Sequence, residues 1–453
     1  MTTGVVVGRE RRLISGWGRT AILSADVAMP ESVEAVVDLV NDSPLIVPRG
    51  LGRSYGDCAQ LSGGVALDMN CLDRITAFDP DSGIVDVEAG VSLDHLMRVL
   101  VPQGWFVPVT PGTRFVTIGG AIASDIHGKN HHHDGTFGEH LVDMTIVTGE
   151  GEVKTVSPAV SPEVFWATVG GMGLTGVIVS ARLRMMPIES SKISSVAVRV
   201  RNLDELIEKM FEVDKAAQYS VAWVDCLARG KSFGRGVLMY GDHATDKQVG
   251  HRADRWDFGA PQPTEFPIDL PTGLLNKYTV KAFNEMWYRK APKSVKPKIE
   301  TMASFFHPLD MVGGWNRVYG SGGFVQYQFV VPDECSDVVR SAMNQLREVG
   351  AASFLAVLKR FGPANQAPLS FPATGWTLAL DIPAQLPGLA ATLDQLDGEV
   401  AEVGGKIYLT KDSRLRPELL ATMYPRMAQW QEVRAQLDPQ HRFNSDMAIR
   451  LGM

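Results

Sequence analysis

Cysteine is scarce in this sequence, which has four among its 453 residues, and no two of them form a C-x-x-C pair. Such spacing indicates neither a disulfide framework nor a zinc site, so reduced thiols are the simplest expectation. Long apolar runs are also lacking, and Ser15-Gly16-Trp17-Gly18 interrupts the sequence directly after the N-terminal arginines. We therefore expect no signal peptide, no transmembrane segment and a cytoplasmic location.

A strong excess of one charge is absent as well. The chain has 44 basic and 51 acidic residues, a net charge of −7, and no basic block. Because nucleic-acid-binding domains need clustered lysine and arginine, this distribution argues against a nucleic-acid partner. Hydrophobic residues make up 45% and charged residues 21% of the chain, which is typical of globular proteins. The length is sufficient for two or three domains.

Three consecutive histidines, His131 to His133, invite a metal-binding interpretation. Consecutive side chains of a regular strand or helix point in different directions, so they cannot converge on one ion. No carboxylate motif such as H-E-x-x-H accompanies them. We predict no metal site.

Hydrophobic periodicity predicts an α+β fold. In the first part of the chain, residues 30–42 and 93–100 have the spacing of amphipathic helices. The strands expected there are residues 45–47, 64–69, 84–88, 143–148 and 176–186. Pro187 and the polar residues after it end this part, so we place a domain boundary there.

A second pattern follows this boundary. Strand–helix–strand units are expected within residues 193–224, 324–359 and 377–409, which predicts an antiparallel sheet with helices on one face. Residues 229–322 show few periodicities and several prolines. So long an irregular segment predicts either a mobile lid over a substrate site or an ordinary surface excursion packed on its own domain.

Two glycine-rich segments stand out: PRGLGRSYGDC at 48–58 and PGTRFVTIGGAIASDIHG at 111–128. Glycine has no Cβ to keep backbone N–H groups away from a phosphate, and Arg49 and Arg53 add positive charge. The G-x-G-x-x-x-G spacing fits the Rossmann fingerprint poorly, and one such loop alone is more often a turn. Two loops of this kind suit a long, bent dinucleotide.

These segments, with FWATVGGMGLTGVI at 165–178, resemble the FAD domain of the vanillyl-alcohol oxidase superfamily. The motifs FFHPLDM, GGFVQYQFVVP, FGPANQAPLSFP and YLTKDSR resemble its actinobacterial oxidases of polyprenyl-phosphoryl-ribose. The resemblance covers nearly the whole chain and implies a two-domain flavoprotein. Its expected parts are an FAD-binding domain at 1–190, a substrate-binding domain at 191–404, and a segment at 405–453 that returns to the FAD domain.

The resemblance also implies a reaction. FAD would oxidise the ribose 2′-hydroxyl of the lipid substrate polyprenyl-phosphoryl-ribose to a ketone, and a short-chain dehydrogenase partner would reduce that ketone to the arabinose epimer for cell-wall arabinan. Peripheral membrane contact, or a periplasmic location, is implied too. The alternatives are an alditol or aldonolactone oxidase acting on a soluble sugar, and a flavin-binding protein without catalytic activity.

By this resemblance the catalytic candidates are Lys411, His127 and Tyr55. Lys411 would bind the sugar hydroxyl, support negative charge on the reduced flavin, or act as a base if burial lowers its pKa. Taken alone, a lysine beside Asp412 is more often a solvated ion pair. His127 is expected to relay a proton or orient the substrate, although a histidine in this context is otherwise usually structural.

The residues expected to hold FAD come from the two glycine-rich segments and from two later positions. They are Pro48, Arg49, Gly50, Leu51, Gly52, Arg53, Ser54, Tyr55, Gly56, Asp57, Cys58, Gly112, Thr117, Ile118, Gly119, Gly120, Ser124, Asp125, Ile126, His127, Ile178 and Tyr408. Many superfamily members attach FAD through a histidine in an R-S-x-G-H pattern, where this chain has Asp57. The resemblance therefore implies non-covalent FAD, with His127 as a less favoured attachment point.

Substrate contacts are expected on the later strands. Gln326 and Gln328 lie two apart on a predicted strand and share a face, where buried amides are costly without partners. Lys359 could meet a phosphate as a point charge, or face solvent. By resemblance the substrate residues are Gln326, Gln328, Lys359, Trp223, Phe306, Ala379 and Lys411, with core packing as the alternative for the two aromatic residues. Mycobacterial members have cysteine at the position of Ala379, so thiol-trapping inhibitors should not bond covalently here.

Overall fold

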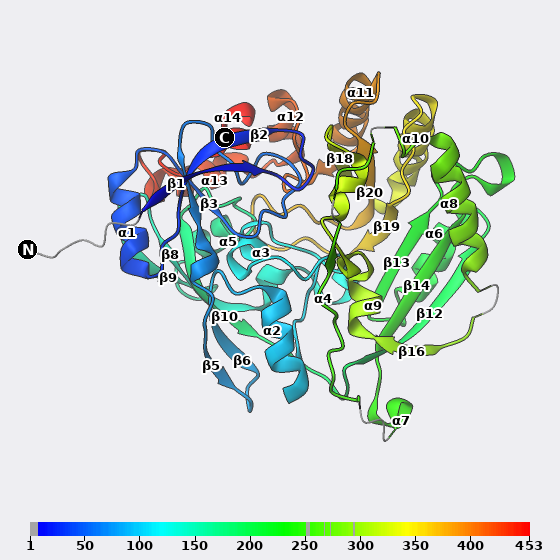
Figure 1. The fold of residues 1–453 in the computed structure, drawn as a ribbon, viewed down its shortest axis with the longest axis horizontal. Helices are drawn as coiled ribbons and strands as arrows, with labels where there is room; N and C mark the ends of the chain where they lie inside the picture. The colour runs from blue at the N-terminus through cyan, green and yellow to red at the C-terminus, as the bar shows by residue number, and fades with distance from the viewer. Residues whose placement is uncertain (1–7, 251–253, 267, 272, 293–294) are drawn as a thin grey trace, which may run out of the picture.

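A computed structural model describes residues 8–250, 254–266, 268–271, 273–292 and 295–453. Figure 1 shows the first half of the chain, blue to cyan, on one side of the molecule and a large sheet, coloured mostly green to yellow, on the other. The C-terminal helices, in red, lie back beside the N-terminal strands. The predicted α+β architecture with an antiparallel sheet is confirmed.

The first half contains two sheets. The four-stranded sheet combines an antiparallel hairpin with parallel strands, in the order β1 (Arg9–Ser15), β2 (Ile22–Ala28), β4 (Val65–Asp68) and β3 (Ile46–Arg49). The five-stranded sheet is antiparallel, in the order β5 (Ile75–Asp79), β6 (Ile84–Glu88), β10 (Val177–Arg184), β8 (Leu141–Val147) and β9 (Val153–Val156).

Helices fill the space around these sheets. The apolar residues of α1 (Val33–Asp42) pack with β3, β4 and the valines of β8 and β10 in one core, and Ser32 caps the helix by accepting a hydrogen bond from Ala35 N–H. On the other side, α2 (Leu93–Leu100) and α3 (Ile118–Ala123) bury their apolar faces against β6, β8 and β10. The predicted helical spacings at 30–42 and 93–100 therefore mark real helices.

The second half is organised by the eight-stranded sheet, in which every neighbouring pair is antiparallel. Its order is β16 (Lys298–Thr301), β12 (Lys192–Val200), β14 (Gly236–His243), β13 (Tyr219–Val224), β19 (Ala356–Phe361), β20 (Gly375–Pro383), β18 (Phe324–Val331) and β21 (Lys406–Ile407). The helices α6 (Leu203–Val213), α10 (Ser336–Glu348) and α11 (Leu389–Glu402) pack on one face around a single core.

The register of this sheet determines what its other face presents. Directly paired residues of antiparallel strands share a face. The pairs Gln326 with Asp381 and Gln328 with Ala379 therefore lie on the face opposite the three helices, beside Lys359, which pairs with Thr377. This face is turned toward the first half of the chain.

The remaining elements are short. They are β7 (Trp105–Phe106), β11 (Met186–Pro187), β15 (Thr264–Glu265), β17 (Val312–Gly313), α4 (His131–Asp134), α5 (Pro162–Thr168), α7 (Asp246–Val249), α9 (Met302–Phe306), η1 (Met69–Cys71), η2 (Val101–Gln103), η3 (Phe137–His140), η4 (Gly230–Ser232), η5 (Pro308–Met311), η6 (Trp315–Tyr319) and η7 (Asp333–Cys335). Among the described residues, no helix is both long and apolar enough to cross a bilayer.

The prediction that residues 229–322 lack regular structure was wrong. This segment contributes β14 and β16 to the large sheet and contains α8 (Lys277–Lys290), which Asn276 caps. The periodicity of α8 was missed because its buried side carries the polar Asn284, while several large apolar residues of the helix are exposed. Residues 251–253, 267, 272, 293 and 294 of the segment lie outside the described part of the chain.

The last segment connects both halves. It begins with β21 at the edge of the large sheet, and then α12 (Pro417–Met423), α13 (Met427–Leu437) and α14 (Asp446–Leu451) return to the first half. Arg450 of α14 forms ion pairs at 2.9 Å with both Asp57 of the first glycine-rich loop and Asp412. Arg450 thus links the C-terminal helix, the loop after β3 and the turn that carries Lys411.

Replacing Arg450 with methionine should lower the free energy of unfolding by roughly 3–5 kcal/mol, because two carboxylates that are mostly buried would lose their shared cation. Arg340→Met is the matched control: it removes an exposed pair with Asp204 and should cost roughly 0–1 kcal/mol. Urea unfolding followed by tryptophan fluorescence measures both. Equal effects of the two substitutions would show that the Arg450 link is not structurally important.

Candidate active site

The first glycine-rich segment follows β3 as an open loop with no helix behind it. Its glycines permit close packing: a Cβ at Gly50 would collide with the Thr117 side chain, and one at Gly56 with the Asp412 carbonyl. Among the described residues, none accepts a hydrogen bond from the backbone N–H of Gly52, Arg53 or Ser54. Such N–H groups are the donors that a phosphate needs, so this loop fits a dinucleotide.

The two arginines of this loop differ. The guanidinium of Arg49 donates to the carbonyls of Ser15 and Ala59, each at 2.7 Å. Arg49 therefore fixes the loop to the chain segments around Ser15 and Ala59. Arg53 stacks its guanidinium 4.0 Å from the ring centroid of Trp17, and its buried Nε has no partner among the described residues.

The second segment is fixed by a cap and by a buried carboxylate. Thr117 caps α3 by accepting a hydrogen bond from Gly120 N–H. Asp125, fully buried and with a left-handed φ of 40°, accepts hydrogen bonds from Gly138 N–H, Asn365 and Ser370. Because the last two residues belong to the connection between β19 and β20, Asp125 holds the glycine-rich segment against the large sheet.

Lys411 lies where the first glycine-rich loop meets the large sheet. Lys411 Nζ hydrogen-bonds Gln326 Oε1, and Gln326 Nε2 in turn donates to Asp381 Oδ1. The Lys411 ammonium also lies 3.8 Å from the centroid of the Tyr55 ring. Burial lowers the pKa of Lys411 and raises the pKa of Asp381, while the attraction between their charges opposes both shifts.

His127 occupies an adjacent position on the same face. Its Nε2 lies 3.2 Å from Gln328 Nε2, which also donates to Thr377 at 3.1 Å. An amide nitrogen can only donate, so Nε2 accepts and the ring proton is on Nδ1. Burial lowers the pKa of His127 well below its usual value, and the nearby lysines add to this shift. His127 is therefore neutral, and its Nδ1 has no partner among the described residues.

Three further aromatic rings surround His127. The rings of Phe361, Tyr408 and Phe371 have centroids 4.7, 5.2 and 5.7 Å from that of the imidazole. Tyr408 also donates through its hydroxyl to the Ser124 carbonyl at 2.9 Å. These contacts fix the imidazole between the second glycine-rich segment and the sheet.

Two more lysines are partly buried at this site. Lys359 lies with Nζ 3.4 Å from the Gly128 carbonyl, and burial, with the charges of Lys411 and Lys129, lowers the pKa of Lys359 to about 7. Lys129 donates to the Phe305 carbonyl, and burial lowers its pKa to about 8. The site thus gathers three partly buried lysines, of which Lys411 interacts with the buried carboxylate of Asp381 and Lys129 with the carboxylate of Glu300.

The other predicted site residues have varied positions. Trp223 shares the site face of the sheet and donates from Nε1 to the Phe354 carbonyl. Phe306 packs among Phe106 and Tyr219 in the core of the first half. Ile178, Pro48 and Cys58 are largely buried structural neighbours of the loops, and burial raises the pKa of Cys58 to about 11.

Sequence reasoning missed three residues of this site: Asp381, Lys129 and Thr377. Asp381 lies two residues beyond Ala379, so strand alternation could have placed it on the same face. A carboxylate within the apolar run of β20 was a further signal. Lys129 directly follows the glycine-rich segment, but the sequence carries no sign that it is buried.

The histidines of α4 have separate neighbours. His131 accepts a hydrogen bond from Gly362 N–H, His132 contacts the Ala217 carbonyl, and His133 is exposed beside Asp134. In the part of the chain that the structure describes, no group of three histidine, cysteine or acidic side chains is arranged to hold a metal ion.

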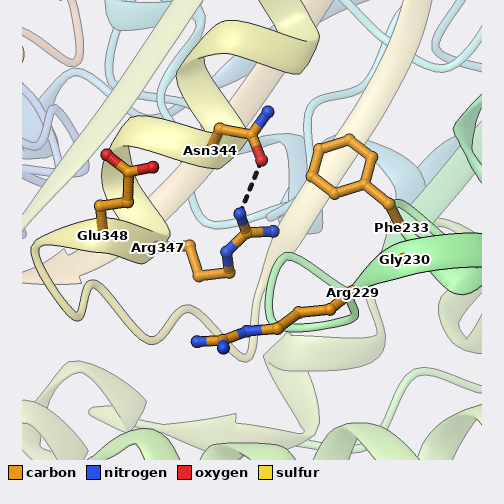
Figure 2. Close-up of a pocket in the computed structure, with 6 residues that line it drawn as sticks. All are labelled: Arg229, Gly230, Phe233, Asn344, Arg347 and Glu348. Carbon is orange, nitrogen blue, oxygen red and sulfur yellow. Dashed lines mark hydrogen bonds between the residues drawn. The ribbon is translucent and has the colours of Figure 1, made fainter.

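A pocket on the helix-covered side of the large sheet is separate from this site. Figure 2 shows this cavity of about 590 Å³, where the guanidinium of Arg347 bonds to Asn344 and that of Arg229 lies nearby. Its lining residues are Arg229, Gly230, Phe233, Asn344, Arg347 and Glu348. None of them is a predicted cofactor or substrate residue.

Comparison with known proteins identifies this architecture. The chain matches the family model of an FAD binding domain over residues 25–157 and that of D-arabinono-1,4-lactone oxidase over residues 392–451. It is 44% identical to the decaprenylphosphoryl-β-D-ribose oxidase of Mycolicibacterium smegmatis, covering 100% of this chain and 99% of that protein.

Two other relatives are more distant. An uncharacterised protein of Streptomyces coelicolor is 39% identical, over 80% of this chain and all of its own length. The D-arabinono-1,4-lactone oxidase of Saccharomyces cerevisiae is 28% identical, over 50% of this chain and 43% of its own length.

These matches confirm the predicted cofactor, FAD, and the predicted reaction class, oxidation of a CH–OH group. The two glycine-rich segments, the first of which has the free N–H groups, both lie within the matched FAD-binding region. The chain therefore belongs to the FAD-dependent oxidoreductases of the vanillyl-alcohol oxidase superfamily, in the family of decaprenylphosphoryl-β-D-ribose oxidase.

Proposed function

We propose that this enzyme oxidises the 2′-hydroxyl of a polyprenyl-phosphoryl-ribose. Its relative in Mycolicibacterium smegmatis is named decaprenylphosphoryl-β-D-ribose oxidase, which supports this class of substrate. The main supporting observation is the excess of partly buried positive charge at the site. Lys129, Lys359 and Lys411 are partly buried around a site whose sheet face carries the buried carboxylate of Asp381. Buried cations need compensating anions, and a sugar phosphate would supply one.

FAD, when bound, supplies the acceptor for the hydride that leaves the ribose C2′. Lys411, in its neutral form, takes the proton of the 2′-hydroxyl on Nζ, because burial keeps a fraction of this amine unprotonated near neutral pH. Gln326 fixes the position of Nζ and connects it to Asp381. The neutral His127 orients the sugar through its Nδ1–H, and Lys359 binds the phosphate.

The finer organisation follows from the same proposal. Residues 1–190 bind FAD without a covalent bond, since Asp57 stands at the position of the attaching histidine and is paired with Arg450. Residues 191–404 form the substrate-binding domain. Residues 405–453 return to the FAD domain. A short-chain dehydrogenase partner reduces the ketone to the arabinose epimer, and the protein meets its lipid substrate at the membrane surface.

Anaerobic mixing of the purified holoenzyme with polyprenyl-phosphoryl-ribose tests the function directly. The visible flavin absorbance should bleach in a single turnover. If a free alditol or aldonolactone, which carries no phosphate group, bleaches the flavin equally well, the soluble-sugar alternative is favoured. A flavin that none of these alcohols reduces would contradict catalysis altogether.

Lys411→Met should retain FAD but reduce its flavin at least ~100-fold more slowly, the usual range for losing a general base. Wild-type reduction should also accelerate as pH rises, because the neutral amine is the active form. Gln345→Met, on α10 at the opposite face of the sheet, is the control. Normal reduction by the Lys411 variant would refute the role assigned to this lysine.

Lys359→Gln should weaken binding of the phosphorylated substrate about tenfold or more, since a hydrogen bond to a charged group is lost. The pKa of Lys359 lies at about 7, so the wild-type lysine is charged below this pH and loses its charge above it. The dissociation constant of the wild type should therefore increase as pH rises through neutrality, while that of the variant stays flatter. Identical pH profiles would exclude Lys359 as the phosphate ligand.

A further inference from the structure

Helix α8 presents large apolar side chains to solvent. Tyr278 is 73% exposed, Met286 61%, Trp287 38% and Phe283 36%. At 100° per residue, Tyr278 and Trp287 lie about 180° apart around the helix axis with the other two side chains between them, so the four residues span one half of the helix. Leu274, in the turn just before the helix, is 46% exposed as well. Contiguous exposed apolar surface of this kind usually marks an interaction site.

The opposite side of α8 is fixed to the protein. Asn284 is fully buried and donates to Asp225 at 2.8 Å, next to β13. Glu285 pairs with Arg235, and Tyr288 donates to the Val200 carbonyl. Because the helix is held by polar contacts on its inner side, its apolar side chains face outward in the folded protein.

Helix α8 also carries an excess of positive charge. The helix carries Lys277, Lys281, Arg289 and Lys290, while its one acidic residue, Glu285, is paired with Arg235 and Arg289. The chain as a whole has a net charge of −7, so this local excess runs against the overall balance. Apolar and aromatic residues flanked by lysine and arginine are typical of helices that lie in the interface of an anionic bilayer.

The helix also adjoins the active site. The ring of Phe283 lies 5.8 Å from that of Phe354, and the Phe354 carbonyl accepts the hydrogen bond of Trp223 on the site face of the sheet. Figure 1 shows α8 running along the large sheet on the molecule's outer side. A surface bound to α8 is therefore close to the site face of the sheet.

We propose that α8 is the docking surface of this protein for an anionic lipid bilayer. Tyr278, Phe283, Met286 and Trp287 enter the interface, and Lys290, on the same half of the helix, contacts the lipid phosphates. The proposal rests on the proposed function only in that a lipid-linked substrate requires access to a membrane. It assigns to one helix the membrane contact that the proposed function leaves without a location.

Co-sedimentation of the holoenzyme with vesicles tests this surface. Wild-type protein should bind vesicles of phosphatidylglycerol and phosphatidylcholine more strongly than vesicles of phosphatidylcholine alone, and salt should weaken this binding. Met286→Asp should reduce partitioning at least about tenfold, because it removes an inserted apolar side chain and adds a negative charge. Leu13→Asp, at an apolar position on β1 that is even more exposed than Met286, should bind as the wild type does.

Anaerobic flavin reduction by a water-soluble, short-chain prenyl-phosphoryl-ribose separates this proposal from the proposed function. Met286→Asp should reduce its flavin as fast as the wild type with this substrate. If this substrate bleaches the flavin of neither protein but the vesicle results are as expected, the proposed function is wrong and the docking proposal is still supported. Equal vesicle binding by Met286→Asp and wild type, or a dimer in solution that this substitution abolishes, would overturn the docking proposal.

Discussion

The buried contact between Lys411, Gln326 and Asp381 is the interaction on which the rest of this structure depends. An ammonium and a carboxylate out of water cost several kcal/mol each unless neighbouring groups compensate them. Here the amide of Gln326 joins them, with its oxygen toward the cation and its nitrogen toward the carboxylate. The arrangement requires three chain segments, far apart in sequence, to meet in one register.

The surrounding structure holds these segments in register. The pairing of β18 with β20 places Gln326 opposite Asp381, and β21 pairs with β18 just before the turn that carries Lys411. The hydrogen bond from Tyr55 N–H to the Thr410 carbonyl, at 3.0 Å, joins this turn to the first glycine-rich loop. A displaced register would leave a buried charge without a partner, so the contact selects one arrangement of the two halves.

Much of this organisation could be predicted from the sequence. Gln326 and Gln328 were placed on one strand face because residues two apart on a strand point the same way, and β18 is the first strand of the unit expected within residues 324–359. The helices α1, α2, α6, α10 and α11 have regular apolar faces. The remaining features depend on tertiary contacts. Burial shifts the pKa of Lys129 down and that of Asp381 up, which the sequence does not reveal. Helix α8 was missed because it exposes the apolar residues that a helix usually buries.

The central claim is that this sheet face directs the ribose C2′ toward the flavin. The most direct test is anaerobic single-turnover bleaching of the holoenzyme with polyprenyl-phosphoryl-ribose carrying deuterium at C2′ or, separately, at C3′. The account predicts slower bleaching with deuterium at C2′ and an unchanged rate with deuterium at C3′. Equal rates for both substrates, or slowing that follows the C3′ label, would contradict it.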